Sequence, residues 1–232
     1  MTKAVLALAG LLLAAPLPAQ AKAGAPPPES KAPQSGKLET DDGPRRSAAV
    51  KRVAAWIASS KDNGSLPYII VDKKNASLFL FDAKGKAIGK APVLIGVAVG
   101  DDATPGIGSK NLAEIGPAEK TTPAGRFLAK YGSAAGGQRV LWVDYATSVA
   151  LHPIPPGASK KERRRQRMLS RTSDDNRITF GCINVPKALY RKSVRPLFRK
   201  KGGYVYVLPD TKPLEVVFPR LRVHALTSDH QR

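Results

Sequence analysis

Short apolar segments separated by turn residues are the feature that most constrains the fold of this chain. Residues 77–81 (SLFLF) are apolar at nearly every position, which is typical of a strand covered on both faces. Similar segments predict further strands at 68–71, 91–95, 125–131, 140–144, 148–152, 177–184 and 203–208. Many short strands with few helical patterns predict a mainly β domain.

Two segments have helical patterns. Residues 45–59 place apolar side chains at i, i+3, i+4 and i+7, which predicts a short amphipathic helix. A second helical stretch is predicted from residue 186 to about residue 200, and Pro196 would kink or split it. Residues 96–123 are rich in Gly, Pro and Asp and predict a long ordered loop, whereas residues 153–176 are polar and strongly basic.

The amino terminus predicts export. Residues 1–21 combine Lys3, an apolar run and a small-x-small ending (AQA), which is typical of a secretory signal peptide. An uncleaved membrane anchor is the alternative, although the apolar run is short for a bilayer span. Residues 22–43, rich in Pro and Ala, predict a disordered linker, and residues 210–232 form a C-terminal tail. We expect no other membrane span and a periplasmic or cell-wall location.

Cys182 is the residue on which a chemical interpretation depends. One cysteine excludes an internal disulfide, and one cysteine with three histidines argues against a structural zinc site, so we expect no metal. Gly181 leaves space for a substrate carbonyl and allows backbone N–H groups to face an oxyanion. A cysteine nucleophile needs a base, and His152 is the one histidine inside the predicted domain, because His224 and His230 lie in the tail. The alternative is a small buried thiol without chemistry.

Several segments resemble the L,D-transpeptidase catalytic domain of the YkuD type. That family has an upstream His followed by Ser/Thr-His-Gly-Cys, a hydrophobic residue and Asn or Arg; here His152 precedes TFGCIN at 179–184. Residues 122–127 (TPAGRF) are similar to the family's T-P-x-G-x-F element, and residues 68–96 to its first hairpin. The resemblance covers about residues 67–209 and implies a β-sandwich or barrel-like domain, with residues 44–66 as a preceding helical segment.

Two departures from the family pattern stand out. The family's His before Gly-Cys is Phe180 here, which puts contacts with the acyl donor in question. His152 and Cys182 are 30 positions apart, about twice the family spacing, and the extra length falls in residues 157–175. Because the entropy of loop closure grows slowly with length, such an insertion need not separate its two ends.

The resemblance implies an exported peptidoglycan L,D-transpeptidase that needs no cofactor. Cys182 would be acylated by a tetrapeptide stem and His152 would move the proton, so that 3–3 cross-links form or a protein is attached. The resemblance also implies residues for the oxyanion and substrate: Gly181, Thr179, Asn184, Arg177 and Phe180. Two alternatives stay open: a peptidoglycan hydrolase or amidase on the same fold, and a non-catalytic wall-binding module in which Phe180 marks lost activity.

The charge of the chain favours an anionic partner. It has 38 Lys and Arg against 18 Asp and Glu, a net charge of +20. Residues 160–167 hold six basic residues in eight, from Lys160 to Arg167. This run is either a solvated charged loop or a lid beside the active site that attracts stem peptides or anionic envelope polymers. Export excludes cytoplasmic nucleic acid, so we expect no nucleic-acid partner.

Overall fold

The computed structural model describes residues 43–158 and 160–222. The predicted signal peptide, nearly all of the linker and the end of the C-terminal tail lie outside the described residues. None of the helices in the described part of the chain has the length and apolar character required to cross a bilayer.

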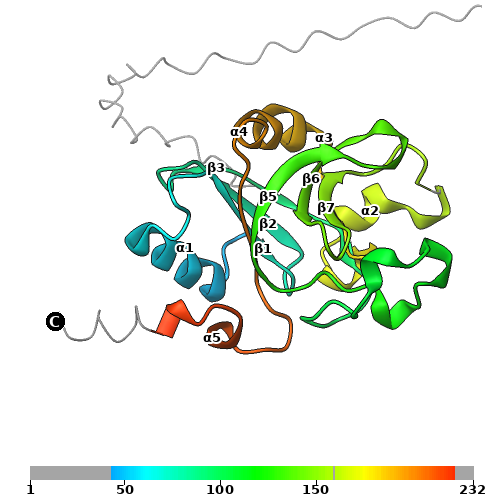
Figure 1. The fold of residues 1–232 in the computed structure, drawn as a ribbon, viewed down its shortest axis with the longest axis horizontal. Helices are drawn as coiled ribbons and strands as arrows, with labels where there is room; N and C mark the ends of the chain where they lie inside the picture. Colours follow the sequence, from blue (N-terminus) through cyan, green and yellow to red (C-terminus); the bar gives the residue numbers. More distant parts are fainter. Residues whose placement is uncertain (1–42, 159, 223–232) are drawn as a thin grey trace, which may run out of the picture. The chain divides into compact units, whose positions relative to one another are not determined.

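An eight-stranded sheet lies at the centre of the fold (Figure 1). Its strands, in order across the sheet, are β3 (Ala87–Pro92), β2 (Ser77–Phe81), β1 (Tyr68–Asp72), β10 (Gly203–Val207), β5 (Gly125–Ser133), β6 (Arg139–Asp144), β7 (Val149–Pro153) and β9 (Ile183–Val185). Leu94, just beyond β3, exchanges backbone hydrogen bonds with Asn184 in β9. The sheet is therefore nearly closed, and the mainly β fold with few short helices predicted from the sequence is confirmed.

Two predicted strands are interrupted. The segment 91–95 is divided between the end of β3 and the start of β4 (Ile95–Gly96). The segment 177–184 is divided between β8 (Arg177–Thr179) and β9, and β8 pairs in parallel with β4 in a separate small sheet. The second interruption has a physical cause, because Gly181 adopts a positive φ of 125° that no continuous strand contains.

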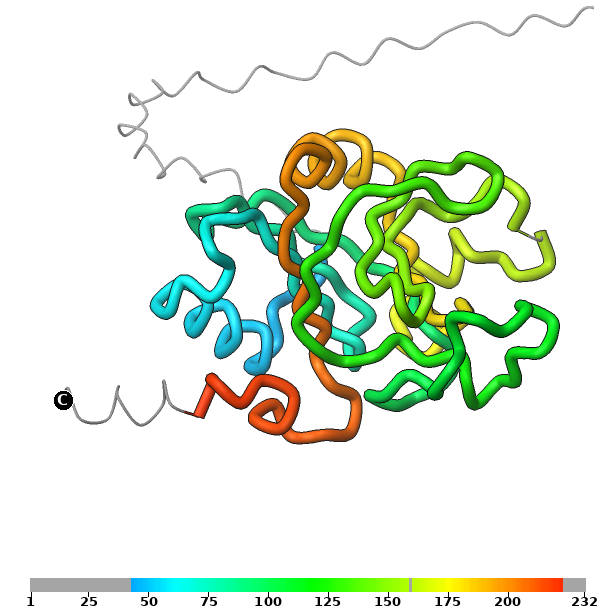
Figure 2. Tube along the Cα trace, viewed as in Figure 1, coloured from blue at the N-terminus to red at the C-terminus, as the bar shows by residue number. Residues whose placement is uncertain are grey.

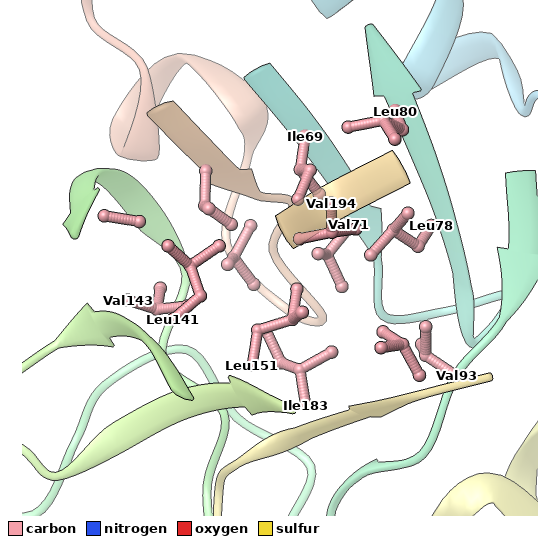
Figure 3. Packing of buried hydrophobic residues seen from close by; sticks show 14 of the residues in the cluster. Ile69, Val71, Leu78, Leu80, Val93, Leu141, Val143, Leu151, Ile183 and Val194 are labelled. Atoms are coloured by element: carbon pink, nitrogen blue, oxygen red, sulfur yellow. The ribbon is translucent and has the colours of Figure 1, made fainter. Parts of the chain in front are cut away.

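Alternate residues of the strands fill the interior of the nearly closed sheet. Figure 3 shows their side chains pointing toward one another; they include Ile69, Val71, Leu78, Leu80, Leu141, Leu151 and Ile183. The period of two in a strand sends every second side chain to the same face, so the neighbouring residues face the other way. The outer face of β7 and β9 is consequently where polar side chains are placed.

The outer face of β1, β2 and β10 carries helix α1 (Ala48–Ser60). Ser47 caps its first turn by accepting the N–H of Val50, as serine at this position commonly does. Trp56 packs edge-on against Tyr206, with ring centroids 6.0 Å apart. The end of the described chain, with α5 (Leu214–Val217), completes this second apolar cluster, so β2 is covered on both faces as predicted.

The predicted helix at 186–200 contains a local irregularity. It comprises α3 (Lys187–Leu189), a π-helical turn (Tyr190–Val194) and α4 (Arg195–Phe198). Pro196 lacks an N–H group and its ring crowds the preceding turn, so a wider turn before it relieves the conflict. Val194 and Phe198 remain buried against the sheet interior.

The basic stretch at 153–176 is more ordered than its sequence pattern indicates. It contains a 3-10 turn (Lys160–Glu162), α2 (Arg164–Met168) and another 3-10 turn (Ser173–Asn176). Met168 is buried, and the buried amide of Asn176 donates a hydrogen bond of 2.7 Å to the carbonyl oxygen of Val93. The segment is therefore anchored to the sheet at one end.

A buried ionic network joins four distant segments of the chain. The ammonium group of Lys73 is fully buried and lies 2.9 Å from Asp101 and 3.3 Å from Asp210. Arg177 donates to Asp210 at 2.7 Å. The Asp101 carboxylate also accepts the backbone N–H groups of residues 210, 211 and 212. Every charge in the network is thus paired and hydrogen-bonded, the condition under which buried charges are tolerated.

We predict that Lys73→Met lowers the free energy of unfolding by roughly 3–5 kcal/mol, because it leaves the buried Asp101 carboxylate without its cation and Asp210 with Arg177 alone. Lys74→Met is the matched control: Lys74 is the exposed neighbour, and its replacement should change stability by no more than about 0.5 kcal/mol. Urea unfolding followed by circular dichroism measures both. Equal losses of unfolding free energy in the two variants would contradict the role of Lys73 in the ionic network.

The same network predicts acid sensitivity. Burial raises the pKa of Asp101, but hydrogen bonds from Lys212, Lys73, Asp210 and Thr211 outweigh it and hold the pKa well below its ordinary value of 3.8. The stability that this depressed pKa provides is therefore complete above about pH 4 and is lost as the pH falls through the folded pKa.

In urea unfolding at pH 7 to pH 2, Asp101→Asn should be less stable at pH 7 and should lose less stability on acidification than the wild type. Asp102→Asn, at the exposed neighbouring carboxylate, should keep the wild-type slope. An unchanged slope in Asp101→Asn would show that other groups cause the acid sensitivity.

Candidate active site

The parallel pairing of β7 with β9 brings the two predicted catalytic residues to adjacent strands. Leu151 pairs with Ile183 and His152 with Asn184, and Cys182 immediately precedes β9. Parallel neighbours require a crossover connection of a dozen or more residues. The path of this crossover can be followed in Figure 2, where its colours run from yellow-green to yellow. A long separation of the two residues in the sequence is thus compatible with their position on neighbouring strands.

The reactive side chains belong to the outer face of this strand pair. Leu151 and Ile183 point into the core, so His152 and Asn184 face the other way. Cys182 lies immediately before β9, in the turn that leads into this strand. Arg164 supports this placement, because its guanidinium donates to the Asn184 side chain at 2.9 Å and acts electrostatically on Cys182 and His152.

A tight turn positions the thiol. Thr179 Oγ1 donates to the carbonyl oxygen of Cys182 at 2.6 Å and accepts the N–H of Gly181 at 3.2 Å. At Gly181, with φ of 125°, a Cβ atom would lie 2.7 Å from the carbonyl oxygen of Thr121. Glycine is therefore required here for both conformational and steric reasons.

Thr122 connects the TPAGRF segment to this turn. Its buried hydroxyl donates to the carbonyl oxygen of Gly181 and accepts the N–H of Gly96, both at 2.8 Å. The hydroxyl thus fixes the turn against β4. A valine of similar shape would leave both backbone groups without a partner.

The thiol of Cys182 is half-buried, and its Sγ lies 3.7 Å from the carbonyl oxygen of Ser148. Burial raises the pKa of the Cys182 thiol, and the backbone of Ala150 and the charge of Arg164 oppose that rise. Within the described residues no hydrogen bond joins Sγ to the His152 imidazole. The thiol is therefore protonated at neutral pH and depends on a base for activation.

The hydrogen bonding of the His152 imidazole leaves one ring nitrogen able to accept a proton. Its Nδ1 lies 2.7 Å from the carbonyl oxygen of Pro153. A carbonyl only accepts, so Nδ1 carries the proton and Nε2 keeps its lone pair. Burial lowers the pKa of His152; the Arg164 charge adds to this, and the bond to Pro153 opposes it. The ring is therefore neutral at pH 7.

Phe180 and Arg177, which the sequence also predicted for the site, contact other residues than Cys182 and His152. Phe180 is 39% exposed, and the Lys120 ammonium lies 3.9 Å from its ring centroid. The guanidinium of Arg177 is occupied by Asp210 and by the carbonyl oxygen of Ala98. Arg177 therefore belongs to the ionic network that holds β8.

Sequence patterns did not single out two residues that the structure brings into this region. In the sequence, Arg164 is one of six similar cations in the basic run. In the structure, its side chain is only 13% exposed and is held by Glu162 and Asn184. The only hint in the sequence is that Glu162 is the single acid in the basic run. Thr122 appears only as part of a resembling motif, without a stated role.

No metal centre is evident in the part of the chain that the structure describes, because no three His, Cys, Asp or Glu side chains gather there. The chemistry that the arrangement supports is nucleophilic: a thiol, a neutral imidazole and a cation on one face of a strand pair.

Comparisons with known proteins add a likeness of fold. No protein-family model and no curated protein matches the chain. Among solved structures, the catalytic domain of the Enterococcus faecium L,D-transpeptidase is 20% identical with a TM-score of 0.35, covering 61% of this chain and 96% of that one. The helical cell shape determining protein Pgp2 from Campylobacter jejuni is 13% identical with a TM-score of 0.42, covering 68% and 56%.

An L,D-transpeptidase from Mycobacterium smegmatis is 14% identical with a TM-score of 0.32, covering 61% of this chain and 58% of that one. The chain spans about half the length of several of the matched proteins. The family that the sequence motifs resemble thus recurs among the matched structures. At these identities and TM-scores the activity of this chain has to be argued from its own residues.

We predict that Gly181→Ala lowers both stability and thiol reactivity, because the added Cβ meets the Thr121 carbonyl oxygen. The melting temperature should fall, and alkylation of Cys182 by iodoacetamide should become slower as the turn shifts. Gly157→Ala, where a Cβ meets nothing within 4 Å, is the control. Wild-type stability and alkylation in Gly181→Ala would contradict the described turn.

Proposed function

We propose that this protein is a cysteine-dependent acyltransferase of the L,D-transpeptidase type that acts on peptidoglycan stem peptides outside the cytoplasm. The observation that carries the proposal is the His152 tautomer: Nδ1 is held by Pro153, so Nε2 is free to accept a proton on the face that also carries Cys182. The sequence motifs around Cys182 supply the substrate class.

The first half-reaction forms a thioester. His152 Nε2 takes the Cys182 thiol proton, and Sγ attacks the carbonyl of the third residue of a tetrapeptide stem. The N–H of Gly181 is already bound to Thr179, so the N–H of Cys182 is the donor that we assign to the oxyanion. The imidazolium then protonates the departing amine, and D-alanine leaves.

The second half-reaction resolves the thioester. The side-chain amine of another stem attacks the acyl carbon, His152 accepts a proton from it, and Cys182 is released as the thiol. The product is a 3–3 cross-link, or an attached protein where the amine belongs to a protein. No cofactor takes part in either step.

The remaining candidate residues have supporting roles in this proposal. Thr179 fixes the turn, and Arg177 acts indirectly by holding β8 through Asp210. Phe180 is exposed and lies two positions before Cys182 in the sequence. We assign it to contact with the acyl donor, at the position where the family has a His. Its ring offers an apolar surface and no proton donor.

A carbapenem tests the proposal because it acylates an activated cysteine. Intact mass analysis should show one covalent adduct on the wild type and none on Cys182→Ala. His152→Gln should slow adduct formation by roughly 10²–10⁴-fold while the melting temperature stays near that of the wild type. Absence of an adduct on the wild type, with sacculus binding intact, would favour a non-catalytic wall-binding module.

Product analysis separates transfer from hydrolysis. Sacculi incubated with the wild type, digested with muramidase and analysed by mass spectrometry should contain new 3–3 dimers. Released stems without new dimers would show that water resolves the thioester, as in a hydrolase or amidase of the same fold.

A further inference from the structure

A large groove lies at the ends of β7 and β9. Its volume is about 1420 Å³, and its lining includes residues 153–156 together with Val185 and Pro186, which we call its floor. Residues of the α2 segment line one part of it and residues of the helix that begins with α3 line another. Small-molecule pockets occupy roughly 300–1000 Å³, so this groove suits a longer, branched ligand.

The charged residues that line the groove are all cations. From the α2 segment come Lys160, Arg163, Arg164 and Arg165. From the segment that starts with α3 come Lys187, Arg191 and Lys192. We call these seven residues and the floor between them the basic groove.

Little of this charge is compensated. Among the residues that the structure describes, no acidic side chain lines the basic groove, and Arg164 is the only lining cation with an ion-pair partner, Glu162. Like charges gathered on a concave surface create a positive potential that concentrates anions. The basic groove therefore fits an anionic ligand.

An unpartnered amide points independently to a ligand. Asn184 is 1% exposed, and its Nδ2 is a buried donor without an acceptor in the described chain. Arg164, which lines the basic groove, donates to the Oδ1 of the same amide and so fixes which atom is left free. A buried donor without a partner costs about 1–3 kcal/mol, and a ligand oxygen would remove that cost.

Arg164 connects the basic groove with the candidate catalytic residues. It lines the groove and donates to the Asn184 side chain, and its charge acts on both Cys182 and His152. A ligand bound at Arg164 therefore lies near these residues, which is the basis for treating the ligand and the acylating substrate as the same compound.

We propose that the basic groove binds the free carboxylates of the peptide that reacts at Cys182, with Arg164 and the Asn184 amide at its inner end. Guanidinium groups bind carboxylates through two parallel hydrogen bonds, and the proline-rich floor offers apolar contact to the aliphatic parts of a peptide. This inference rests on the proposed function for the identity of the peptide. It assigns substrate recognition to the crossover insertion.

Binding to an unreactive protein tests the inference separately from catalysis. The full chain carrying Cys182→Ala is titrated by calorimetry with a synthetic tetrapeptide stem, and with the same peptide whose carboxylates are amidated. We expect the amidated peptide to bind at least about tenfold more weakly, because charge-assisted hydrogen bonds to guanidinium are lost.

A charge variant shows where the carboxylates bind. Adding Arg165→Ser, Lys187→Ser and Arg191→Ser should weaken binding of the free peptide about tenfold, flatten its salt dependence and leave the amidated peptide unaffected. The matched control replaces three exposed cations that do not line the groove: Lys84→Ser, Lys86→Ser and Arg199→Ser. It has the same net charge and should bind both peptides as the parent does.

Arg164 is tested by two substitutions. Arg164→Lys keeps the charge and loses the forked guanidinium, whereas Arg164→Gln loses both. Discrimination between the free and the amidated peptide should be reduced in Arg164→Lys and reduced further in Arg164→Gln. Full discrimination in Arg164→Gln would remove Arg164 from the site.

The outcomes separate this inference from the proposed function. If the groove variant binds each peptide as tightly as its control does, the inference is wrong, even where the carbapenem adduct forms normally. If binding of polyphosphate depends on the same cations and binding of the peptide does not, the inference is wrong and the basic groove binds a phosphate polymer. Carboxylate-dependent binding without any acylation of the wild type would support the groove and reject the proposed catalysis.

Discussion

The parallel pairing of β7 with β9 is the constraint on which the rest of this structure depends. Its register places His152 opposite Asn184 and brings Cys182, immediately before β9, close to the start of β7. The backbone hydrogen bonds between Leu94 and Asn184 extend this pairing toward β3 and nearly close the sheet. Parallel neighbours need a crossover connection, and here that connection contains the insertion that carries Arg164.

Two groups of interactions surround the Cys182 thiol. On the inner side, Thr122 and Thr179 hold the backbone of the turn through hydroxyl groups, and Gly181 allows a conformation that other residues cannot adopt. On the outer side, the cation of Arg164 disfavours a protonated imidazole at His152 and favours a thiolate at Cys182. The two effects act together, since a neutral base and a thiol that can release its proton are what an acylation step requires.

The sequence predicted the mainly β fold and most strand positions, because apolar segments such as residues 77–81 carry a strong local signal. It failed where tertiary contacts decide the backbone: the break at Gly181 depends on the Thr121 carbonyl oxygen, and the order at 153–176 depends on Asn176 reaching Val93. The basic run showed its charge but not the burial of Arg164, because no periodicity distinguishes one arginine from its neighbours. The catalytic roles of Cys182 and His152 stay a proposal that their shared face supports.

The proposed role of His152 as a base depends on its protonation state. In ¹⁵N-labelled protein, the imidazole nitrogen shifts recorded between pH 5 and pH 8 report both the tautomer and the pKa. The account predicts a neutral ring at pH 7 with its proton on Nδ1 and a pKa below 6.5, so that Nε2 is free to accept the thiol proton. A proton on Nε2, or an imidazolium that persists at pH 7, would contradict it.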